Sequence, residues 1–245
     1  MAQKFSTALV IGASSGIGEA LVRQLVAAGT TVAAVARREA ELRRVAESAG
    51  ADKVKIYVHD VRDFGATPAL FERIVADMGG LDLVVYNAGV MPEVAESEYS
   101  FEKDRLMVEV NLLGAMAWFN PAGAYMEARR AGTLAGISSV AGDRGRRGAP
   151  VYTASKAGFT AYLEALRNRL DRYGVSVVTV KPGPVDTAMT AGKKLPLLID
   201  VERCAHESLG IIRGGTGVGY VPAIWGPIML LIQHIPSIVF RRTNI

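Results

Sequence analysis

A tyrosine and a lysine stand four residues apart in VYTASKAGF, residues 151–159. On an α-helix this spacing places Tyr152 and Lys156 on one face, about one turn apart. A free tyrosine has a pKa of about 10, too high for efficient proton exchange near neutral pH, and a neighbouring ammonium favours the phenolate. The pair is therefore typical of a phenol that exchanges protons with a substrate, although such pairs also occur on ordinary helix surfaces.

A glycine-rich turn, GASSGIG, spans residues 12–18 and follows the first apolar run. Gly12, Gly16 and Gly18 let backbone N–H groups approach a phosphate, and a helix beginning here adds its positive N-terminus. The spacing G-x-x-x-G-x-G differs from the G-x-G-x-x-G of other dinucleotide folds. The alternatives are a tight turn without a ligand and the G-x-S-x-G elbow of a hydrolase, with Ser14 as nucleophile. Because only one strand precedes Ser14, whereas a hydrolase elbow follows several, a dinucleotide site is favoured.

The second apolar run ends in AVARRE, residues 34–39. In dinucleotide folds an acidic residue near this place bonds the ribose hydroxyls of NAD. Here Ala36 takes that place, and Arg37 and Arg38 follow it. Guanidinium groups bind a 2′-phosphate in a forked arrangement, whereas a carboxylate would repel it. The sequence therefore favours NADP(H) over NAD(H), the alternative being a solvated basic start to a helix.

Strand-like runs alternate with helical patterns, and these elements must position the residues above. We expect strands at about 5–12, 30–37, 53–60, 81–89, 132–139 and 175–183, with helices at about 18–29, 39–50, 66–78, 100–129 and 152–174. Near-continuous apolar strands separated by helices indicate an α/β fold, a doubly wound parallel sheet of Rossmann-like type with helices on both faces. No linker interrupts the pattern, so we expect a single domain over 1–245, with 188–245 forming a substrate lid and an apolar tail.

Composition narrows the classes of protein and partner. The chain has 245 residues, of which 50% are hydrophobic and 21% charged, with a formal net charge of +4. That length can bury one large core, and the mild basic excess suits an anionic ligand. No block of basic residues interleaved with aromatics indicates nucleic-acid binding, and three histidines with one cysteine show no metal-ligand spacing. With no signal-peptide layout at the N-terminus, a cytoplasmic protein is expected.

Further motifs follow the glycine turn in order: YNAG at 86–89, ISSVAG at 137–142, YTASK at 152–156 and KPGPVDT at 181–187. As a set they resemble the short-chain dehydrogenase/reductase family, over residues 5 to about 190. Each motif is weak by itself, but the set in this order is highly specific. The sequence departs from the family mildly at Tyr86, where asparagine is more common.

The resemblance implies that Asn111, Ser139, Tyr152 and Lys156 are catalytic, and the family's spacing selects Ser139 over Ser138. Tyr152 would exchange the proton, Ser139 would orient the carbonyl oxygen, and Lys156 would lower the pKa of the phenol and bond the nicotinamide ribose. Asn111 would hold a water that links Lys156 to solvent. In addition to Tyr152 and Lys156, the implied cofactor-binding residues are Gly12, Ser14, Ser15, Gly16, Ile17, Gly18, Arg37, Arg38, Asp60, Val61, Asn87, Ala88, Gly89, Pro182, Gly183, Val185 and Thr187. Among these, Asp60 would meet the adenine, and Val185 and Thr187 the nicotinamide carboxamide.

The implied function is an NADP-dependent oxidoreductase that transfers a hydride between nicotinamide and a carbonyl or secondary alcohol, with Tyr152 as general acid/base. The alternative is a non-catalytic NADP(H)-binding regulator on the same fold. The family's habit implies a homodimer or homotetramer, formed through the helices that carry Asn111 and Tyr152.

The substrate is expected beyond the carboxyl ends of the strands. Candidate positions there are mostly apolar, which favours an apolar substrate: Val90, Met91, Val140, Ala149, Val151, Pro184, Met189, Leu195, Leu197 and Leu198. The segment DRGRR at 143–147 adds three arginines, which either receive an acidic group on the substrate or form a solvated loop.

The tail is strongly apolar from 221 to 240 and ends in Arg241 and Arg242. Its length matches a bilayer span, but three prolines, Gln233 and His234 interrupt it, which argues against a spanning helix. Three interpretations stay open for 221–242: a lid over the pocket, an oligomer interface, or a peripheral membrane contact.

Overall fold

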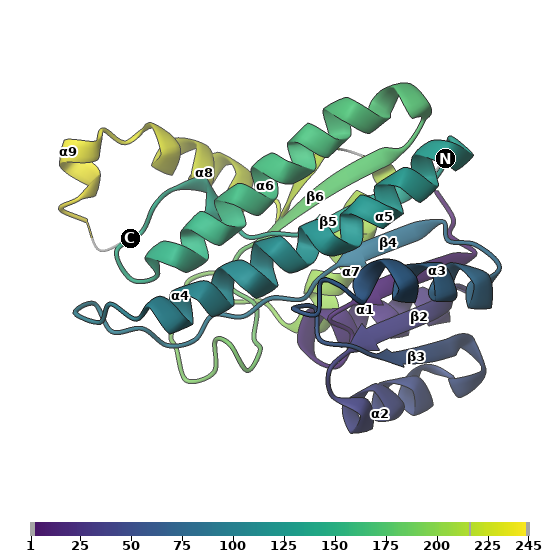
Figure 1. The fold of residues 1–245 in the computed structure, drawn as a ribbon. Helices are drawn as coiled ribbons and strands as arrows, with labels where there is room; N and C mark the ends of the chain where they lie inside the picture. The colour runs from purple at the N-terminus through teal and green to yellow at the C-terminus, as the bar shows by residue number, and fades with distance from the viewer. Residues whose placement is uncertain (1–2, 216, 244–245) are drawn as a thin grey trace.

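The computed structural model describes residues 3–215 and 217–243. Over these residues the chain forms one seven-stranded parallel sheet in the order β3-β2-β1-β4-β5-β6-β7 (Figure 1). The strands are β1 Thr7–Ile11, β2 Thr31–Ala36, β3 Val54–Val58, β4 Leu83–Tyr86, β5 Thr133–Ile137, β6 Ser176–Pro182 and β7 Val218–Val221. The predicted doubly wound, Rossmann-like sheet is confirmed.

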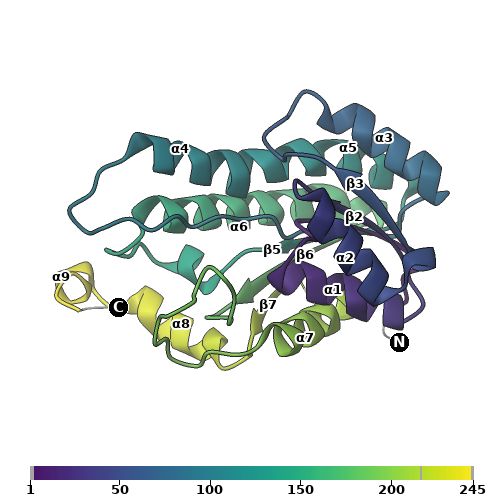
Figure 2. The ribbon, with the colours of Figure 1, turned by 90° about the horizontal axis from the view of Figure 1, so that it is seen from below.

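Helices cover both faces of the sheet, as Figure 2 shows from below. Helices α1, α2 and α7 pack on one face, and α3, α4, α5 and α6 on the other. Their bounds are α1 Gly16–Ala27, α2 Glu39–Ala49, α3 Thr67–Met78, α4 Phe101–Val108, α5 Gly114–Arg129, α6 Pro150–Leu170 and α7 Val201–Gly214. Four short turns complete these connections: η1 Ala51–Lys53, the π-helical η2 Glu109–Leu113, η3 Val140–Asp143 and η4 Asp171–Tyr173.

The core consists of two apolar layers, one on each face of the sheet. Neighbouring residues of β1 point to opposite faces: Val10 belongs to the layer under α1 and α7, while Leu9 and Ile11 belong to the layer under α5 and α6. All three side chains are fully buried. Burial on both faces explains why the central strands read as continuous apolar runs rather than alternating ones.

The carboxyl ends of the strands lie along one edge of the sheet, because all the strands are parallel. The strand order reverses between β1 and β4, which places the glycine turn after β1 beside the YNAG segment after β4. The ends of β5 and β6 bring Ser139 and the KPG segment to the same edge. Such a reversal leaves a crevice in which α/β proteins bind ligands.

The last quarter of the chain contains elements that the sequence did not predict. Asp200 caps the start of helix α7, because its carboxylate accepts a hydrogen bond from the Arg203 backbone N–H, and Gly215 follows the end of the helix in a left-handed conformation. The chain then forms β7 at the sheet edge and continues into α8 Trp225–His234 and α9 Ser237–Phe240. Of the predicted domain, 1–245, residues 1–2, 216 and 244–245 lie outside the described residues. No helix in the described part of the chain is long and apolar enough to cross a bilayer.

Candidate active site

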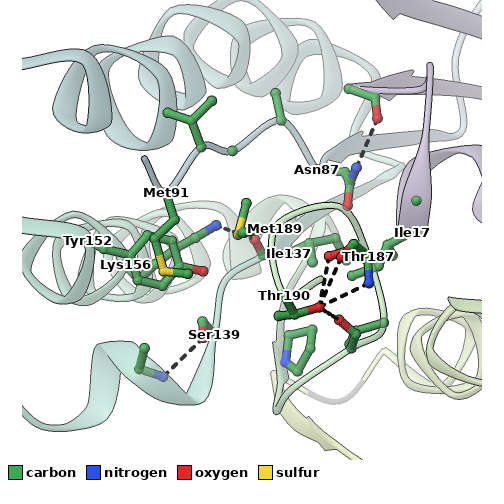
Figure 3. A pocket seen from close by; sticks show the side chains of 18 of the residues that line it. Ile17, Asn87, Met91, Ile137, Ser139, Tyr152, Lys156, Thr187, Met189 and Thr190 are labelled. Atoms are coloured by element: carbon green, nitrogen blue, oxygen red, sulfur yellow. Dashed lines mark hydrogen bonds between the residues drawn. The ribbon is translucent and has the colours of Figure 1, made fainter. Parts of the chain in front are cut away.

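A cavity of about 1030 Å³ opens at the carboxyl edge of the sheet and runs from the glycine turn to Trp225 at the start of α8. Figure 3 shows Tyr152, Lys156 and Ser139 on one side of it, and Thr187 and Thr190 on the other. All predicted cofactor residues line it except Gly18, and all predicted catalytic residues line it except Asn111. The structure therefore brings together in one space residues from positions 12 to 187 of the chain.

Tyr152 and Lys156 lie on the first turns of α6, one turn apart as predicted from their spacing. The Lys156 ammonium is buried, donates a 3.0 Å hydrogen bond to the Ile137 carbonyl at the end of β5, and lies 6.0 Å from the centre of the Tyr152 ring. Tyr152 is partly exposed to the cavity. Helix α6 therefore presents both groups to the cavity and fixes the distance between them.

Burial shifts the pKa of both members of this pair. Burial raises the pKa of Tyr152, while a hydrogen bond with Ser139 and the positive charge of Arg146 act to lower it. Burial also lowers the pKa of Lys156, to about 8. The Lys156 ammonium is not among the groups that lower the pKa of Tyr152 here; it donates to the Ile137 carbonyl. That Lys156 lowers the pKa of the phenol stays a prediction.

The two serines at the end of β5 have different environments. Ser138 is buried, and its hydroxyl bonds Thr160 and the Lys156 carbonyl within the protein, at 2.8 and 3.2 Å. Ser139 lines the cavity, and its hydroxyl accepts a 3.0 Å hydrogen bond from the Ala141 N–H (Figure 3). Ser139 is thus placed to meet a ligand, whereas Ser138 joins the strand to α6.

Asn111 lies behind the cavity wall, in the π-helical turn η2 between α4 and α5. Its amide is fully buried and makes three hydrogen bonds: with the Val90 N–H at 2.8 Å, the Val90 carbonyl at 3.0 Å and the Ser155 hydroxyl at 3.0 Å. A Cβ added at Gly89 would lie 3.4 Å from the Lys156 ammonium and 3.5 Å from the Asn111 amide oxygen. Asn111 therefore ties the loop after β4 to α6, next to Lys156.

Tyr86, the departure from the family pattern, supports this same turn. Its ring is fully buried at the end of β4, and its hydroxyl donates a 2.5 Å hydrogen bond to the Val110 carbonyl. Gly114 makes room for it, since a Cβ there would come within 2.4 Å of the hydroxyl oxygen. The π-helical turn breaks the regular α-helical hydrogen bonding of this segment. Tyr86 therefore supplies a hydrogen-bond donor to the Val110 carbonyl, next to Asn111.

The glycine turn meets the requirements of a pyrophosphate site. Gly12 has φ +89°, and a Cβ there would come within 2.6 Å of the Ala88 backbone. Helix α1 begins at Gly16 with no side-chain cap on its first N–H groups, which leaves them for an anion. Gly18 does not line the cavity; a Cβ there would lie 2.0 Å from the Gly12 carbonyl, so its role is close packing of α1 against the turn.

The two arginines after β2 lie beside this turn. The exposed Arg38 guanidinium donates hydrogen bonds to the hydroxyls of Ser14 and Ser15, at 3.0 and 2.9 Å. Arg37 lies 4.0 Å from the Asp60 carboxylate, which pairs more closely with Arg62, at 2.7 Å. The hydrogen bond from Arg62 holds the pKa of Asp60 below its usual range. Because Ser14 faces Arg38, a cation that cannot act as a base, the structure gives no support to the hydrolase alternative.

The loop after β6 forms the wall opposite Tyr152. The Thr190 hydroxyl bonds the Val185 carbonyl at 2.5 Å, and the Thr187 N–H donates to the same hydroxyl at 3.0 Å (Figure 3). Pro182, Gly183, Val185 and Thr187 all line the cavity. The residues present therefore fit a dinucleotide: a glycine turn and an open helix N-terminus at one end, and polar groups around Tyr152 at the other.

The mouth of the cavity is mostly apolar, as predicted, but its lining differs in detail. Val151, Leu197 and Leu198 do not line it, and the last two are exposed. Trp225 and Arg146 do line it. No sequence motif indicated Trp225, because it lies 42 positions beyond Gly183 on a helix that was not predicted. Only the folding of the chain brings it to the cavity. The predicted apolar residues that do line the mouth are Val90, Met91, Val140, Ala149, Pro184, Met189 and Leu195.

Helix α8 is apolar on two sides. On the inner side Trp225 lines the cavity, and the fully buried Met229 packs with Val140. On the outer side Leu230 and Leu231 are 57% and 73% exposed. The lid interpretation of the tail agrees with the inner side, while the exposed side leaves the oligomer and membrane interpretations as predictions.

Comparisons with known proteins agree with this geometry. The family model described as short chain dehydrogenase matches residues 6–196. An uncharacterized oxidoreductase of Myxococcus xanthus (strain DK1622) is 36% identical over 223 residues, covering 88% of this chain and 87% of the relative. An uncharacterized oxidoreductase of Staphylococcus aureus (strain MW2) is 33% identical over 184 residues, covering 75% and 80%.

Solved structures share the fold. A short-chain type dehydrogenase/reductase from Mycobacterium ulcerans superposes with a TM-score of 0.81 at 24% identity, over 90% of this chain and 89% of the other. ElxO with NADP bound superposes with a TM-score of 0.80 at 19% identity, over 89% and 97%.

Proposed function

Because this chain belongs to the short-chain dehydrogenase/reductase family, and is thus an oxidoreductase, we propose that it is an NADP(H)-dependent enzyme acting on a carbonyl or secondary alcohol. Tyr152 is the general acid/base of this proposal, and Ser139, Lys156 and Asn111 complete its catalytic set. The observation that carries it is that Tyr152, Ser139 and Lys156 line the same cavity as the glycine turn.

A bound nicotinamide dinucleotide supplies or accepts the hydride. The chain itself must handle the proton. In reduction, the Tyr152 hydroxyl gives its proton to the oxygen that becomes an alcohol, and in oxidation the phenolate takes it back. Burial raises the pKa of Tyr152, so the phenol is protonated at neutral pH and ready to act as a donor. Oxidation should therefore accelerate as the pH rises, because it requires the phenolate.

The neighbours of Tyr152 have supporting roles. The Ser139 hydroxyl bonds and orients the reacting oxygen beside the phenol. The pKa of Lys156 is about 8, and an oxygen-rich ribose beside the ammonium would favour its protonated form. Asn111 keeps the Val90 loop against α6 through its three hydrogen bonds. In this set Tyr152 transfers the proton, and its neighbours position the groups so that the transfer is efficient.

The preference for NADP(H) rests on the residues after β2. Ala36 leaves space where an acidic residue would meet the ribose, and Arg38 lies over the serines of the glycine turn. A guanidinium there favours a 2′-phosphate. ElxO, which shares the fold, has a structure with NADP bound, in keeping with this preference.

The proposal extends to the assembly and its surroundings. Pairing through the helices that carry Asn111 and Tyr152 would give a homodimer or homotetramer, which light scattering after size-exclusion chromatography measures. The exposed leucines of α8, followed by Arg241 and Arg242, suit a peripheral contact with an anionic membrane. Flotation of the full chain with liposomes tests that contact.

The function itself is tested by a screen of ketones, aldehydes and secondary alcohols with NADPH, NADP⁺, NADH and NAD⁺, followed at the NADPH absorbance. We expect turnover with an apolar carbonyl compound and a preference for NADPH over NADH. Tight NADPH binding without turnover across the panel would contradict the proposal and favour the non-catalytic regulator.

A further inference from the structure

The arginines of the loop between η3 and α6 have three different environments. Arg144 donates to the carbonyls of Gln233 and Ile235, at 2.5 and 2.8 Å, and its guanidinium stacks 4.5 Å from the Phe240 ring. Arg147 is exposed, donates to the Thr243 carbonyl at 3.3 Å and lies 3.5 Å from Glu96. These two residues attach the loop to the tail and to the loop after β4.

Arg146 has no comparable structural role. Its side chain lines the cavity, and its Nε–H is buried with no hydrogen-bond partner among the described residues. Burial lowers the pKa of the guanidinium, while the charges of Tyr152 and Asp143 act against that shift. The side chain is only partly buried, but a buried N–H without a hydrogen-bonded partner is unfavourable, so the Arg146 Nε–H calls for a ligand.

The carboxylate in the same loop is already engaged. Asp143 is almost fully buried, and one of its oxygens accepts a 2.6 Å ion-pair contact from Lys181 on β6. Its other oxygen accepts a 2.9 Å hydrogen bond from the Tyr220 hydroxyl on β7. This cluster anchors the loop to the sheet and leaves Arg146 facing the cavity with no ion pair to any residue that the structure describes.

Two other buried polar groups of the cavity are also hydrogen-bond donors. Besides the Arg146 Nε–H, the Thr153 hydroxyl and the Trp225 indole N–H are buried without hydrogen-bond partners among the described residues, and both side chains line the cavity. All three groups can donate hydrogen bonds. The surrounding residues of the mouth are mostly apolar, with Glu96, Arg147 and Lys193 also lining the cavity. A suitable ligand therefore combines an apolar body with an oxygen-rich, negatively charged group.

We propose that Arg146 determines substrate specificity by binding an oxyanion, a carboxylate or a phosphate, on an otherwise apolar carbonyl or alcohol substrate. The inference rests on the proposed function, because it assumes that the substrate reacts beside Tyr152. It also narrows the substrate class: neutral apolar ketones fill the mouth but leave the guanidinium unpaired. Arg38, by contrast, lies at the glycine turn, so the two arginines serve different ligands.

The test uses calorimetric titration of the full chain with octanoate, octyl phosphate and methyl octanoate, none of which can react. We expect each anion to bind about 10- to 100-fold more tightly than the neutral ester, as for hydrogen bonds to a charged group. Arg146→Met should abolish that preference while leaving the Kd for NADPH unchanged. Arg146→Lys should keep part of it, and Arg169→Met, which removes the same charge from the exposed far end of α6, should keep all of it. The octanoate and octyl phosphate arms distinguish the two anions.

Several outcomes would overturn the assignment. These are an anion preference that survives in Arg146→Met, no preference in the wild-type chain, or a loss of NADPH affinity in Arg146→Met. Turnover of 2-oxooctanoate against methyl 2-oxooctanoate adds a second readout: equal loss for both substrates in Arg146→Met, with a shifted pH profile, would make the residue a tuner of Tyr152 instead. Selective anion binding without turnover of any carbonyl compound would contradict the proposed function and leave the anion site standing.

Discussion

The two ends of the cavity each present an arginine, and they are built in opposite ways. At the glycine turn, the exposed Arg38 lies against the hydroxyls of Ser14 and Ser15. At the mouth, Arg146 is partly buried and its Nε–H has no partner among the described residues. The first arginine is already satisfied and adds charge to a preformed phosphate site, whereas the second is unsatisfied until a ligand arrives. We therefore expect the cofactor end to serve every substrate alike, and the mouth to distinguish between substrates.

Between these ends lies the reacting centre, and the largest effect is expected there. Tyr152→Phe removes the proton that the carbonyl oxygen takes up on reduction, so turnover should fall by about 10²- to 10⁴-fold or more. The Kd for NADPH should change little, because the ring and its packing remain. Steady-state rates and NADPH fluorescence titration measure the two quantities. Tyr162→Phe is the matched control on the same helix, with its hydroxyl bonded to Asn120 at 3.1 Å outside the cavity. Near-normal turnover in Tyr152→Phe would refute its role.

The next effect separates the two arginines. Arg38→Leu should weaken NADPH binding by about 10- to 100-fold, the cost of losing hydrogen bonds to a charged group, and should leave NADH binding and the KM of the carbonyl substrate unchanged. Arg43→Leu, on the exposed side of α2 where Arg43 pairs with Glu39, is the control. A rise in the substrate KM in Arg38→Leu would contradict the proposal that Arg38 and Arg146 serve different ligands. Arg37→Asp should further shift the preference towards NAD(H).

Lys156, which lies between the two ends, gives a further test, because burial of its ammonium lowers the stability of the folded state. Its pKa falls from 10.5 to about 8 on burial, so between these pH values the native state binds fewer protons than the unfolded state. The unfolding free energy of the wild-type chain should therefore rise with pH across that window. Lys156→Met should abolish activity and raise the unfolding free energy by up to about 3 kcal/mol at pH 7, a gain that fades by about pH 10.5.

Urea denaturation at several pH values measures this difference, with the exposed Lys53→Met as control. A stability difference between Lys156→Met and wild type that stays constant from pH 7 to pH 11 would show that burial of the ammonium carries no cost.

The smallest effect is expected behind the cavity wall. Tyr86→Phe leaves the Val110 carbonyl without the phenolic donor, which should lower the unfolding free energy by about 1–3 kcal/mol. Because the carbonyl lies next to Asn111, kcat should fall a few-fold, with less change in either Kd. Thermal unfolding and steady-state rates check both expectations. An unchanged kcat at lowered stability would limit Tyr86 to a structural role.

Sequence reasoning was strongest where local chemistry fixes local structure. The glycine turn, the alternation of strands and helices, and the four-residue spacing of Tyr152 and Lys156 all depend on nearby residues, and the structure has them as predicted. The missed elements depend on distant contacts. Strand β7 has only four residues, one of them glycine, and stands at the sheet edge beside β6. Helix α7 carried readable signals in Asp200 and Gly215, which mark its two ends.

The candidate site shows the same division. The sequence could place three arginines in one loop, but not say that Arg146 and Arg147 line the cavity while Arg144 is held by the tail. Nor could it show that burial raises the pKa of Tyr152 against the hydrogen bond with Ser139 and the charge of Arg146. Both facts arise from packing between segments that are far apart along the chain.

The central claim is that Tyr152 stands beside the reacting carbon–oxygen group at the nicotinamide end of the cavity. The most direct test is a crystal structure of the chain with NADP⁺ and an alcohol identified by the screen. We predict that the hydroxyls of Tyr152 and Ser139 both lie within hydrogen-bonding distance of the alcohol oxygen, with the Lys156 ammonium towards the ribose. A Tyr152 ring turned into the interior, or an alcohol bound away from it, would contradict the account.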